Sequence, residues 1–426
     1  MAENTSNNIN NACSGGQAPA QPSQSAVPQG GYYTQQASQP APGQQAQQVN
    51  PYGAQPSQGQ PYPYAPTQPA MQYVPYQYQN SYPIYPSNPY YYDPVRAREE
   101  YEKRLKVEKA KSSLRYLGNM AGLSVLLFLI FNTVMSTVLA VPKFAELYKT
   151  NSVFTSGFFI VSSFFYLFIP FTIIALLTRI KDKNVNFFPF RKMKPKRALL
   201  CIPIGLTVCI IANIFTNFII NIFDSFGVEL SQQSDSMAEP QNAFALFLAF
   251  MCTAVMPALL EEYSLRGVIL QPARKYGMVF AIVSSSAIFG LMHGNLIQAP
   301  FAFLVGMCFA YLSIKCDSLW IGVILHLINN GFSVIMSYVG ERVSETSLNI
   351  AYYVIISVTA VAGIACLVVL IMTDRQFFKK EEGNIAGEEA KILSKGQKFV
   401  AYFINVPMII SFVLIILLTA QFVARK

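Results

Sequence analysis

The chain has 426 residues, of which 52% are hydrophobic and only 12% are charged, and its formal net charge is +9. Because residues 1–95 are polar, the remainder is far more apolar than a soluble domain. The composition therefore excludes an ordinary soluble enzyme and predicts an integral membrane protein.

Residues 1–95 form the first predicted segment, a tail rich in Gln, Pro and Tyr. It carries no charged residue between Glu3 and Asp93. Such a chain cannot bury a hydrophobic core, so we predict that it is disordered. Its Tyr and Pro residues could bind a protein partner, and a plain solvated tail is the alternative. The N-terminus lacks the pattern of a cleaved signal peptide, so we expect internal helices to direct membrane insertion.

Residues 96–115 are highly charged and predict a juxtamembrane helix with Glu–Lys and Glu–Arg pairs. An anionic leaflet would attract its basic excess. Nine apolar runs follow, each long enough to span or nearly span a hydrocarbon core of about 30 Å, although the fifth is short. They cover residues 117–141, 153–178, 198–223, 243–271, 278–293, 296–314, 318–338, 350–373 and 398–424.

These runs predict an all-α fold, a polytopic transmembrane bundle of about 8–9 helices. We place the bundle at residues 116–374, a charged cytoplasmic linker at 375–397 and a C-terminal transmembrane helix at 398–426.

The distribution of Lys and Arg predicts the orientation of the chain. If the N-terminus is cytoplasmic and all nine runs span, 26 of the 31 Lys and Arg residues fall on the cytoplasmic side. This is the bias that the positive-inside rule describes. The loop between the third and fourth runs carries only acidic charges and is placed outside. We therefore predict a multi-pass protein of the cell membrane with a cytoplasmic N-terminus.

Three polar strings interrupt the apolar runs and contain the only two histidines of the chain. The strings are Glu261-Glu262-Tyr-Ser-Leu-Arg266, Phe289-Gly-Leu-Met-His293 and His326-Leu-Ile-Asn-Asn330. The rise of an α-helix places Glu261, His293, His326 and Asn330 about 15, 22, 12 and 18 Å above the cytoplasmic ends of their helices. A titratable group at mid-membrane is usually functional. We therefore expect the three strings to form one polar cavity.

Spacing within the strings predicts which side chains share a helix face. Glu262 and Arg266 are four residues apart with the acid first, which favours an ion pair. That pairing would turn Glu261 in another direction. His326 and Asn330 are also four residues apart and share a face.

Each string also has a purely structural interpretation. The acidic string could form an ion cluster at a cytoplasmic helix end, His293 could lie at the wetted outer interface, and the last string could supply interhelical hydrogen bonds. The apolar residues that follow Arg266 favour a helix that stays in the membrane. Phe289 can pack under and orient His293. Pro257 removes a backbone hydrogen bond and can kink its helix.

The three strings, in this order on separate membrane helices, resemble the CPBP family of intramembrane proteases. That family includes the Rce1-like type II CAAX-prenyl proteases and the Abi bacteriocin-processing and immunity proteins. Each string alone is a weak pattern, and the combination is specific. The resemblance covers about residues 195–340 and departs from the family at Leu265, where Phe is frequent. It implies an all-helical core and hydrolysis of a peptide bond in a membrane-associated or lipidated peptide or protein substrate.

Peptide hydrolysis needs a base that activates water, donors for the oxyanion and an acid for the leaving amine. We predict that Glu261 is the general base and that His293 holds the same water or carries the proton. His326 and Asn330 can both offer an N–H group to the oxyanion.

Glu262 with Arg266 would brace the site, and a share in holding the water is the alternative for Glu262. The seven cysteines form no CxxC pair, so no Cys-based zinc site is predicted. A metalloprotease is nevertheless an alternative, because Glu261, His293 and His326 could bind catalytic zinc. The His-Glu-x-x-His pattern is absent, so we favour the metal-free form and predict no firm cofactor.

Two other functions compete with the peptidase. One is a non-catalytic membrane immunity or scaffold protein whose cavity binds a hydrophobic partner. The other is a proton-coupled transporter, which ranks last because the expected repeat with paired broken helices is not visible. The predicted partners are thus a membrane-associated substrate and the lipid bilayer, with no nucleic acid.

Overall fold

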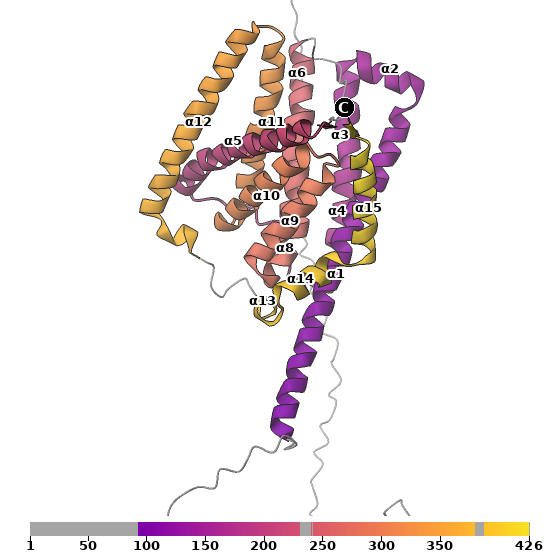
Figure 1. Cartoon of the computed structure of the whole chain (residues 1–426), viewed down its shortest axis with the longest axis vertical. Coiled ribbons are helices and arrows are strands. Elements are labelled where there is room, and N and C mark those ends of the chain that lie inside the picture. The colour runs from indigo at the N-terminus through magenta and orange to yellow at the C-terminus, as the bar shows by residue number, and fades with distance from the viewer. Residues whose placement is uncertain (1–92, 231–239, 241, 380–386, 426) are drawn as a thin grey trace, which may run out of the picture. The chain divides into compact units, whose positions relative to one another are not determined.

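A computed structural model describes residues 93–230, 240, 242–379 and 387–425. The predicted tail, residues 1–95, lies outside the described residues except for its last three. The described chain is almost entirely helical, which confirms the all-α fold class. The helices are α1 (Pro94–Leu139), α2 (Pro142–Thr150), α3 (Ser152–Ser163), α4 (Ile169–Lys181), α5 (Pro195–Ser225), α6 (Ala243–Phe250), α7 (Met256–Glu261), α8 (Leu270–Ala273), α9 (Met278–Met292), α10 (Gln298–Lys315), α11 (Trp320–Gly340), α12 (Glu345–Thr373), α13 (Glu389–Ile392), α14 (Lys395–Phe403) and α15 (Val406–Ala420) (Figure 1).

Several of these helices are continuous with their neighbours. π-helical turns join α3 to α4, α6 to α7 and α7 to α8, at Phe164–Phe168, Met251–Val255 and Glu262–Ile269. Short 3-10 turns lie at Arg274–Tyr276 and Arg375–Phe378. Among the described residues the only strands are β1 (Val228–Leu230) and β2 (Val423–Arg425), which pair antiparallel.

Seven helical segments of the described chain are long and apolar enough to cross a membrane. They are Pro94–Leu139, Ser152–Lys181, Pro195–Ser225, Ala243–Tyr276, Gln298–Lys315, Trp320–Gly340 and Glu345–Thr373. An eighth is present if α14 and α15, which meet at a bend of 76°, are counted as one span. The predicted fifth run forms α9, a shorter apolar helix. The chain is therefore a multi-pass membrane protein.

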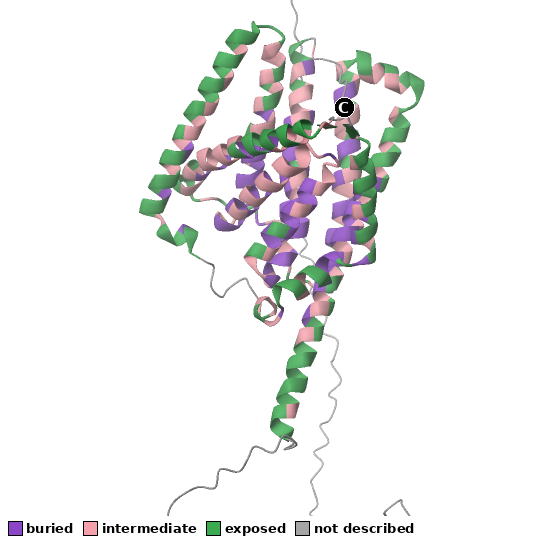
Figure 2. Ribbon diagram, in the orientation of Figure 1, coloured by how far each residue is buried: buried purple, intermediate pink, exposed green. Residues whose placement is uncertain are grey.

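Helix α1 combines the predicted juxtamembrane helix, residues 96–115, with most of the first apolar run. Asp93 caps it by accepting hydrogen bonds from the backbone N–H groups of Val95 and Arg96, and Pro94 opens its first turn. The charged stretch 96–115 continues without a break into the apolar span. Figure 2 shows that the charged half is mostly exposed, whereas the apolar half is partly buried against its neighbours.

The C-terminal helices α14 and α15 pack against α1. Gly118 and Gly122, one turn apart on α1, allow this close approach, because a Cβ at Gly122 would lie 2.5 Å from the backbone nitrogen of Met408. The predicted span 398–424 is divided at Asn405, whose side chain caps α15, with Pro407 in its first turn.

Two of the apolar clusters of the core contain residues of the helices that carry the polar strings. One cluster includes Leu265 and Phe289, and the other includes Phe309 and Leu325. The continuous helix Ala243–Tyr276 packs against α9 and α11, and α5 packs against α10, α11 and α12. In Figure 1, α9 and α10 lie at the centre of this group. The outer face of α12 presents apolar side chains such as Val361, as expected for contact with lipid.

Candidate active site

The best-buried charged pair of the site lies within the π-helical turn Glu262–Ile269. Oε1 of Glu262 lies 3.2 Å from Nη1 of Arg266, and the two side chains are 0% and 1% exposed. The guanidinium centre lies 4.6 Å from the centroid of the Phe289 ring, and Nη2 donates to the carbonyl of Gly306 at 3.4 Å. The structure thus contains the ion pair that the four-residue spacing predicts. Buried charges require such compensation.

His326 on α11 links this pair to the second carboxylate. Its Nδ1 lies 3.3 Å from Oε1 of Glu262, and its Nε2 lies 3.7 Å from Oε2 of Glu261. Since a carboxylate oxygen accepts hydrogen bonds, we assign the Nδ1 proton to the contact with Glu262. The formal charges of Glu261, Glu262, Arg266 and His326 cancel when His326 is protonated.

The two adjacent glutamates differ in accessibility. Glu262 is fully enclosed, whereas the side chain of Glu261, the last residue of α7, is 20% exposed. Glu261 lies beside His326, at a distance longer than a direct hydrogen bond. Of the two carboxylates, only Glu261 can therefore meet a water molecule or a substrate.

His293 lies at the C-terminal end of α9. Its Nδ1 is 2.9 Å from the carbonyl oxygen of Phe289. A carbonyl only accepts, so Nδ1 carries a proton and Nε2 is left to act as an acceptor in the neutral ring. The Phe289 ring lies edge-on to both imidazoles, with centroid distances of 5.0 Å to His293 and 6.2 Å to His326. Phe289 therefore packs beside both histidines, and none of the ion pairs described for the two glutamates involves His293.

Asn330, one turn beyond His326, is held by contacts with two neighbours. Its Nδ2 donates to the carbonyl of Thr253 at 3.2 Å, and its Oδ1 accepts from Asn329 at 3.1 Å. Pro257 lacks the N–H group that would bond the Thr253 carbonyl in an α-helix, which leaves this oxygen able to accept from Asn330. The second amide N–H of Asn330 remains available to a ligand.

The residues proposed for zinc do not come together as a metal site. In the part of the chain that the structure describes, no three His, Cys, Asp or Glu side chains are arranged to hold a metal ion. Glu261 and His326 are neighbours, but the polar contact of His293 is with the backbone of Phe289. Zinc binding by Glu261, His293 and His326 therefore stays a prediction from the sequence, and the reaction is derived from the side chains alone.

Two supporting residues were not predicted from the sequence. Phe309 packs on the His326 ring at a centroid distance of 6.0 Å. Gly322 allows α11 to approach Glu262, because a Cβ at this position would collide with Oε2 of Glu262. Gly322 is four residues before His326, so a search of the same helix face would have found it. Phe309 carries no such signal, because it is on another helix.

The part of the chain that contains this site is similar to known proteins. Residues 243–332, which contain every residue of the three polar strings, match the family described as type II CAAX prenyl endopeptidase Rce1-like. The chain is 23% identical over 189 residues to the membrane-embedded CAAX protease MroQ of Staphylococcus aureus, covering 42% of this chain and 74% of MroQ. It is 31% identical over 93 residues to YdiL, a candidate membrane peptidase of Bacillus subtilis, covering 22% of this chain and 38% of YdiL. No solved structure matches the chain.

Proposed function

We propose that this chain, which carries an Rce1-like CAAX protease segment over residues 243–332, is an intramembrane endopeptidase. Its substrate would be a membrane-associated or lipidated peptide or protein. The observation that supports this most directly is the arrangement of Glu261, the accessible carboxylate, against an imidazole that a buried Glu262–Arg266 pair holds. A carboxylate and an imidazole at this separation suit the activation of water.

In the proposed reaction, Glu261 removes a proton from a water molecule, and the resulting hydroxide attacks the carbonyl carbon of the scissile bond. The proton then passes to the nitrogen of the leaving amine, either from Glu261 directly or through Nε2 of His326. His326 can exchange this proton because Glu262 fixes the other edge of its ring.

The developing oxyanion needs a hydrogen-bond donor whose side chain is already held in position. Asn330 is suited to this role, because the Thr253 carbonyl and Asn329 fix its amide plane while one N–H stays available. Nε2 of His293, an acceptor in the neutral ring, would orient the attacking water. His326, predicted as an oxyanion donor, lies instead between two carboxylates, which favours the role of proton carrier.

The substrate class within this proposal is a membrane-bound precursor. MroQ is named as a CAAX protease, and processing of a CAAX-type C-terminus or maturation of a secreted peptide would both place the scissile bond at the membrane. In either case the substrate would reach the site from the bilayer or its interface, since Glu261, His326 and Asn330 lie on helices long and apolar enough to span a membrane.

The test is a comparison of membrane peptides in host cells that express the wild-type chain or Glu261→Gln. New peptide termini that appear only with the wild-type chain, together with the uncut precursor in Glu261→Gln cells, would identify the substrate. If both cells give the same termini and show the same protection from a bacteriocin, the chain is a non-catalytic immunity protein and the proposal fails.

A further inference from the structure

Two cysteines from different helices lie in contact where α10 ends. Cys201 belongs to α5, and Cys316 directly follows α10. The Sγ atoms of the two residues are 3.9 Å apart, although the residues are 115 positions apart in the chain. The two sulfur atoms of a disulfide are about 2.0 Å apart. The two thiols are therefore about 2 Å short of a disulfide, a distance that rotation of the side chains can close.

The same face of α5 contacts the end of α10 at two successive points. Arg197 lies four residues before Cys201, so the two side chains share a helix face. Nη1 of Arg197 donates to the carbonyl oxygen of Lys315 at 3.3 Å, and Lys315 directly precedes Cys316. The packing of α5 against α10 thus keeps the two thiols together.

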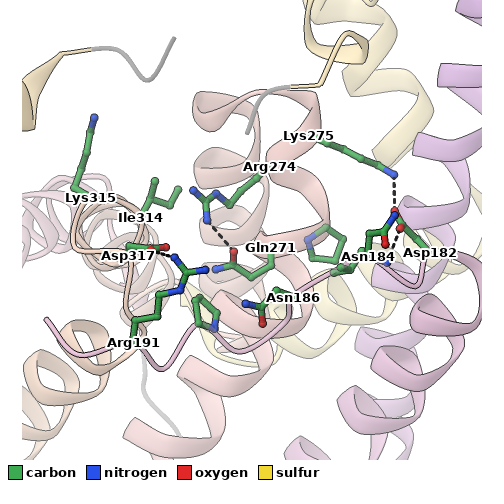
Figure 3. A pocket seen from close by; sticks show the side chains of 13 residues that line it. Asp182, Asn184, Asn186, Arg191, Gln271, Arg274, Lys275, Ile314, Lys315 and Asp317 are labelled. Carbon is green, nitrogen blue, oxygen red and sulfur yellow. Dashed lines mark hydrogen bonds and ion pairs between the residues drawn. The ribbon is translucent and has the colours of Figure 1, made fainter. Parts of the chain in front are cut away.

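The turn after Cys316 is held by the segment that precedes α5. Asp317 has a φ of 49°, a left-handed conformation that few residues other than glycine adopt. Its carboxylate forms an ion pair with Arg191 (Figure 3). The N–H group of Leu319 donates to the carbonyl oxygen of Pro189 at 3.1 Å. Because contacts hold both α5 and this turn, the contact between the thiols belongs to the fold and needs no rearrangement of the helices.

The two thiols differ in accessibility. Cys201 is 0% exposed, whereas Cys316 is partly exposed. A small oxidant therefore meets Cys316 first, and Cys201 is placed to attack the oxidised sulfur. The charge bias of the sequence predicts that this end of α10 is cytoplasmic. Thiols of the cytoplasm are kept reduced, so the dithiol is the resting form.

We propose that Cys201 and Cys316 are a modification site, which a hydroperoxide such as hydrogen peroxide converts into a reversible disulfide. The thiolate of Cys316 attacks one oxygen of the peroxide, so that an S–O bond forms, the O–O bond breaks and the other oxygen leaves as water after protonation. The deprotonated Cys201 then attacks the Cys316 sulfur, which forms the S–S bond and releases the remaining oxygen as water. Both thiols are oxidised, and the peroxide is reduced to water. Exchange with a cellular thiol restores the dithiol.

The disulfide would link α5 to the turn that leads into α11, the helix that carries His326. The two helices also meet further along, because a Cβ at Gly205 would lie 2.6 Å from Cδ1 of Leu325. A disulfide between residues far apart in the chain restricts the unfolded state, so oxidation should raise the temperature of unfolding. The proposal does not depend on the peptidase activity, because neither cysteine has a role in the proposed reaction.

The experiment treats the full chain in bilayer vesicles with hydrogen peroxide and measures the thiols that a reductant restores. Thiols that remain after oxidation are blocked with an alkylating reagent, the protein is reduced, and the restored thiols are labelled with a maleimide of high mass that shifts the band in a gel. Dimedone, which traps sulfenic acids, is applied in parallel. The variants are Cys201→Ala and Cys316→Ala. The control is Cys366→Ala, which removes another partly exposed cysteine, on α12.

We expect the reductant to restore a pair of thiols in the wild-type chain and in Cys366→Ala, and none in Cys201→Ala or Cys316→Ala. Cys201→Ala should instead retain a sulfenic acid at Cys316, because the attacking thiol is missing, and peroxide should not raise its unfolding temperature. Cys316→Ala keeps the test decisive if Cys201→Ala does not fold. A restored pair in Cys316→Ala would show a disulfide between other cysteines and would overturn the proposal. A wild-type chain in which the reductant restores no thiol would overturn it as well.

Discussion

At the residue scale, substitution of the two adjacent glutamates is predicted to change stability by very different amounts. Glu262→Gln leaves Arg266 buried without its counter-charge, which should lower the free energy of unfolding by about 3–5 kcal/mol. Glu261→Gln changes a partly exposed side chain at 3.7 Å from His326, so we expect a change below about 1 kcal/mol. Thermal unfolding of both variants in the same mild detergent gives the comparison. A Glu262→Gln variant as stable as Glu261→Gln would contradict the buried pair.

His293 offers a second prediction, because its two nitrogens have separate roles. His293→Asn keeps an N–H group that can donate to the Phe289 carbonyl, so the free energy of unfolding should change by less than about 1 kcal/mol. It removes the Nε2 position, so the rate of cleavage should fall about 100-fold or more. His293→Gln places its amide near Nε2 and should retain more activity. If the Asn variant were the more active of the two, the assignment of the nitrogens would be wrong.

The sequence predicted residue pairs within one helix better than pairs between helices. The spacing of Glu262 and Arg266 fixes their geometry locally, and the structure has that ion pair. The contact of His326 with Glu262 joins residues 64 positions apart, and no spacing rule gives it. The contacts of His326 with both glutamates were therefore seen only in the structure.

At the element scale, the packing of α1 against the C-terminal helices gives a third prediction. A Cβ at Gly122 would lie 2.5 Å from the Met408 nitrogen, whereas a Cβ at Gly157 would have nothing within 4 Å. Gly122→Ala should therefore destabilise the chain by about 1–3 kcal/mol. The matched Gly157→Ala should be neutral or stabilise by up to about 1 kcal/mol.

Unfolding temperatures of these two glycine variants, measured with the purified full chain, check the prediction. Equal effects of the two substitutions would show that α14 and α15 do not pack on α1 as the structure has them.

The positions of helices were predictable because an apolar run long enough for a membrane is a strong signal. Eight of the nine runs fall on continuous helical segments, and the ninth is divided between α14 and α15 at Asn405. The geometry within these helices was harder to predict from the sequence. Pro257 predicted a disturbance of its helix, and a π-helical turn directly precedes α7, whereas the second π-helical turn, which contacts α9, has no such signal in the sequence. The break before α15 had a local signal, because Asn405 caps the helix and Pro407 lies in its first turn. The hydropathy of the run alone does not show this signal.

At the scale of the whole molecule, the cytoplasmic orientation of the N-terminus stays a prediction from the charge bias. In a chain with its native cysteines replaced, Lys149→Cys should react with a membrane-impermeant thiol reagent in intact cells. Lys183→Cys, in the strongly basic segment after α4, should react only after the membrane is permeabilised. Both positions are exposed, so access to each depends on the side of the membrane. The reverse pattern of labelling would invert the topology.

Depth arithmetic along the helices predicted that the three polar strings lie at a common level, and it could not say which side chains meet there. That depends on how α9 and α11 rotate about their axes, which is set by side-chain packing such as Phe289 and Phe309 around His326. The tail remains a prediction from composition, because residues 1–92 lie outside the described part.

The most direct test of the central claim is cleavage by the purified full chain in vesicles, with a substrate identified from the comparison of host cells. We predict that Glu261→Gln lowers the rate about 100-fold or more. The control is Glu345→Gln, a carboxylate in the exposed first turn of α12, and it should cleave at the wild-type rate. Cleavage by Glu261→Gln at the wild-type rate would contradict the account of a peptidase that activates water with Glu261.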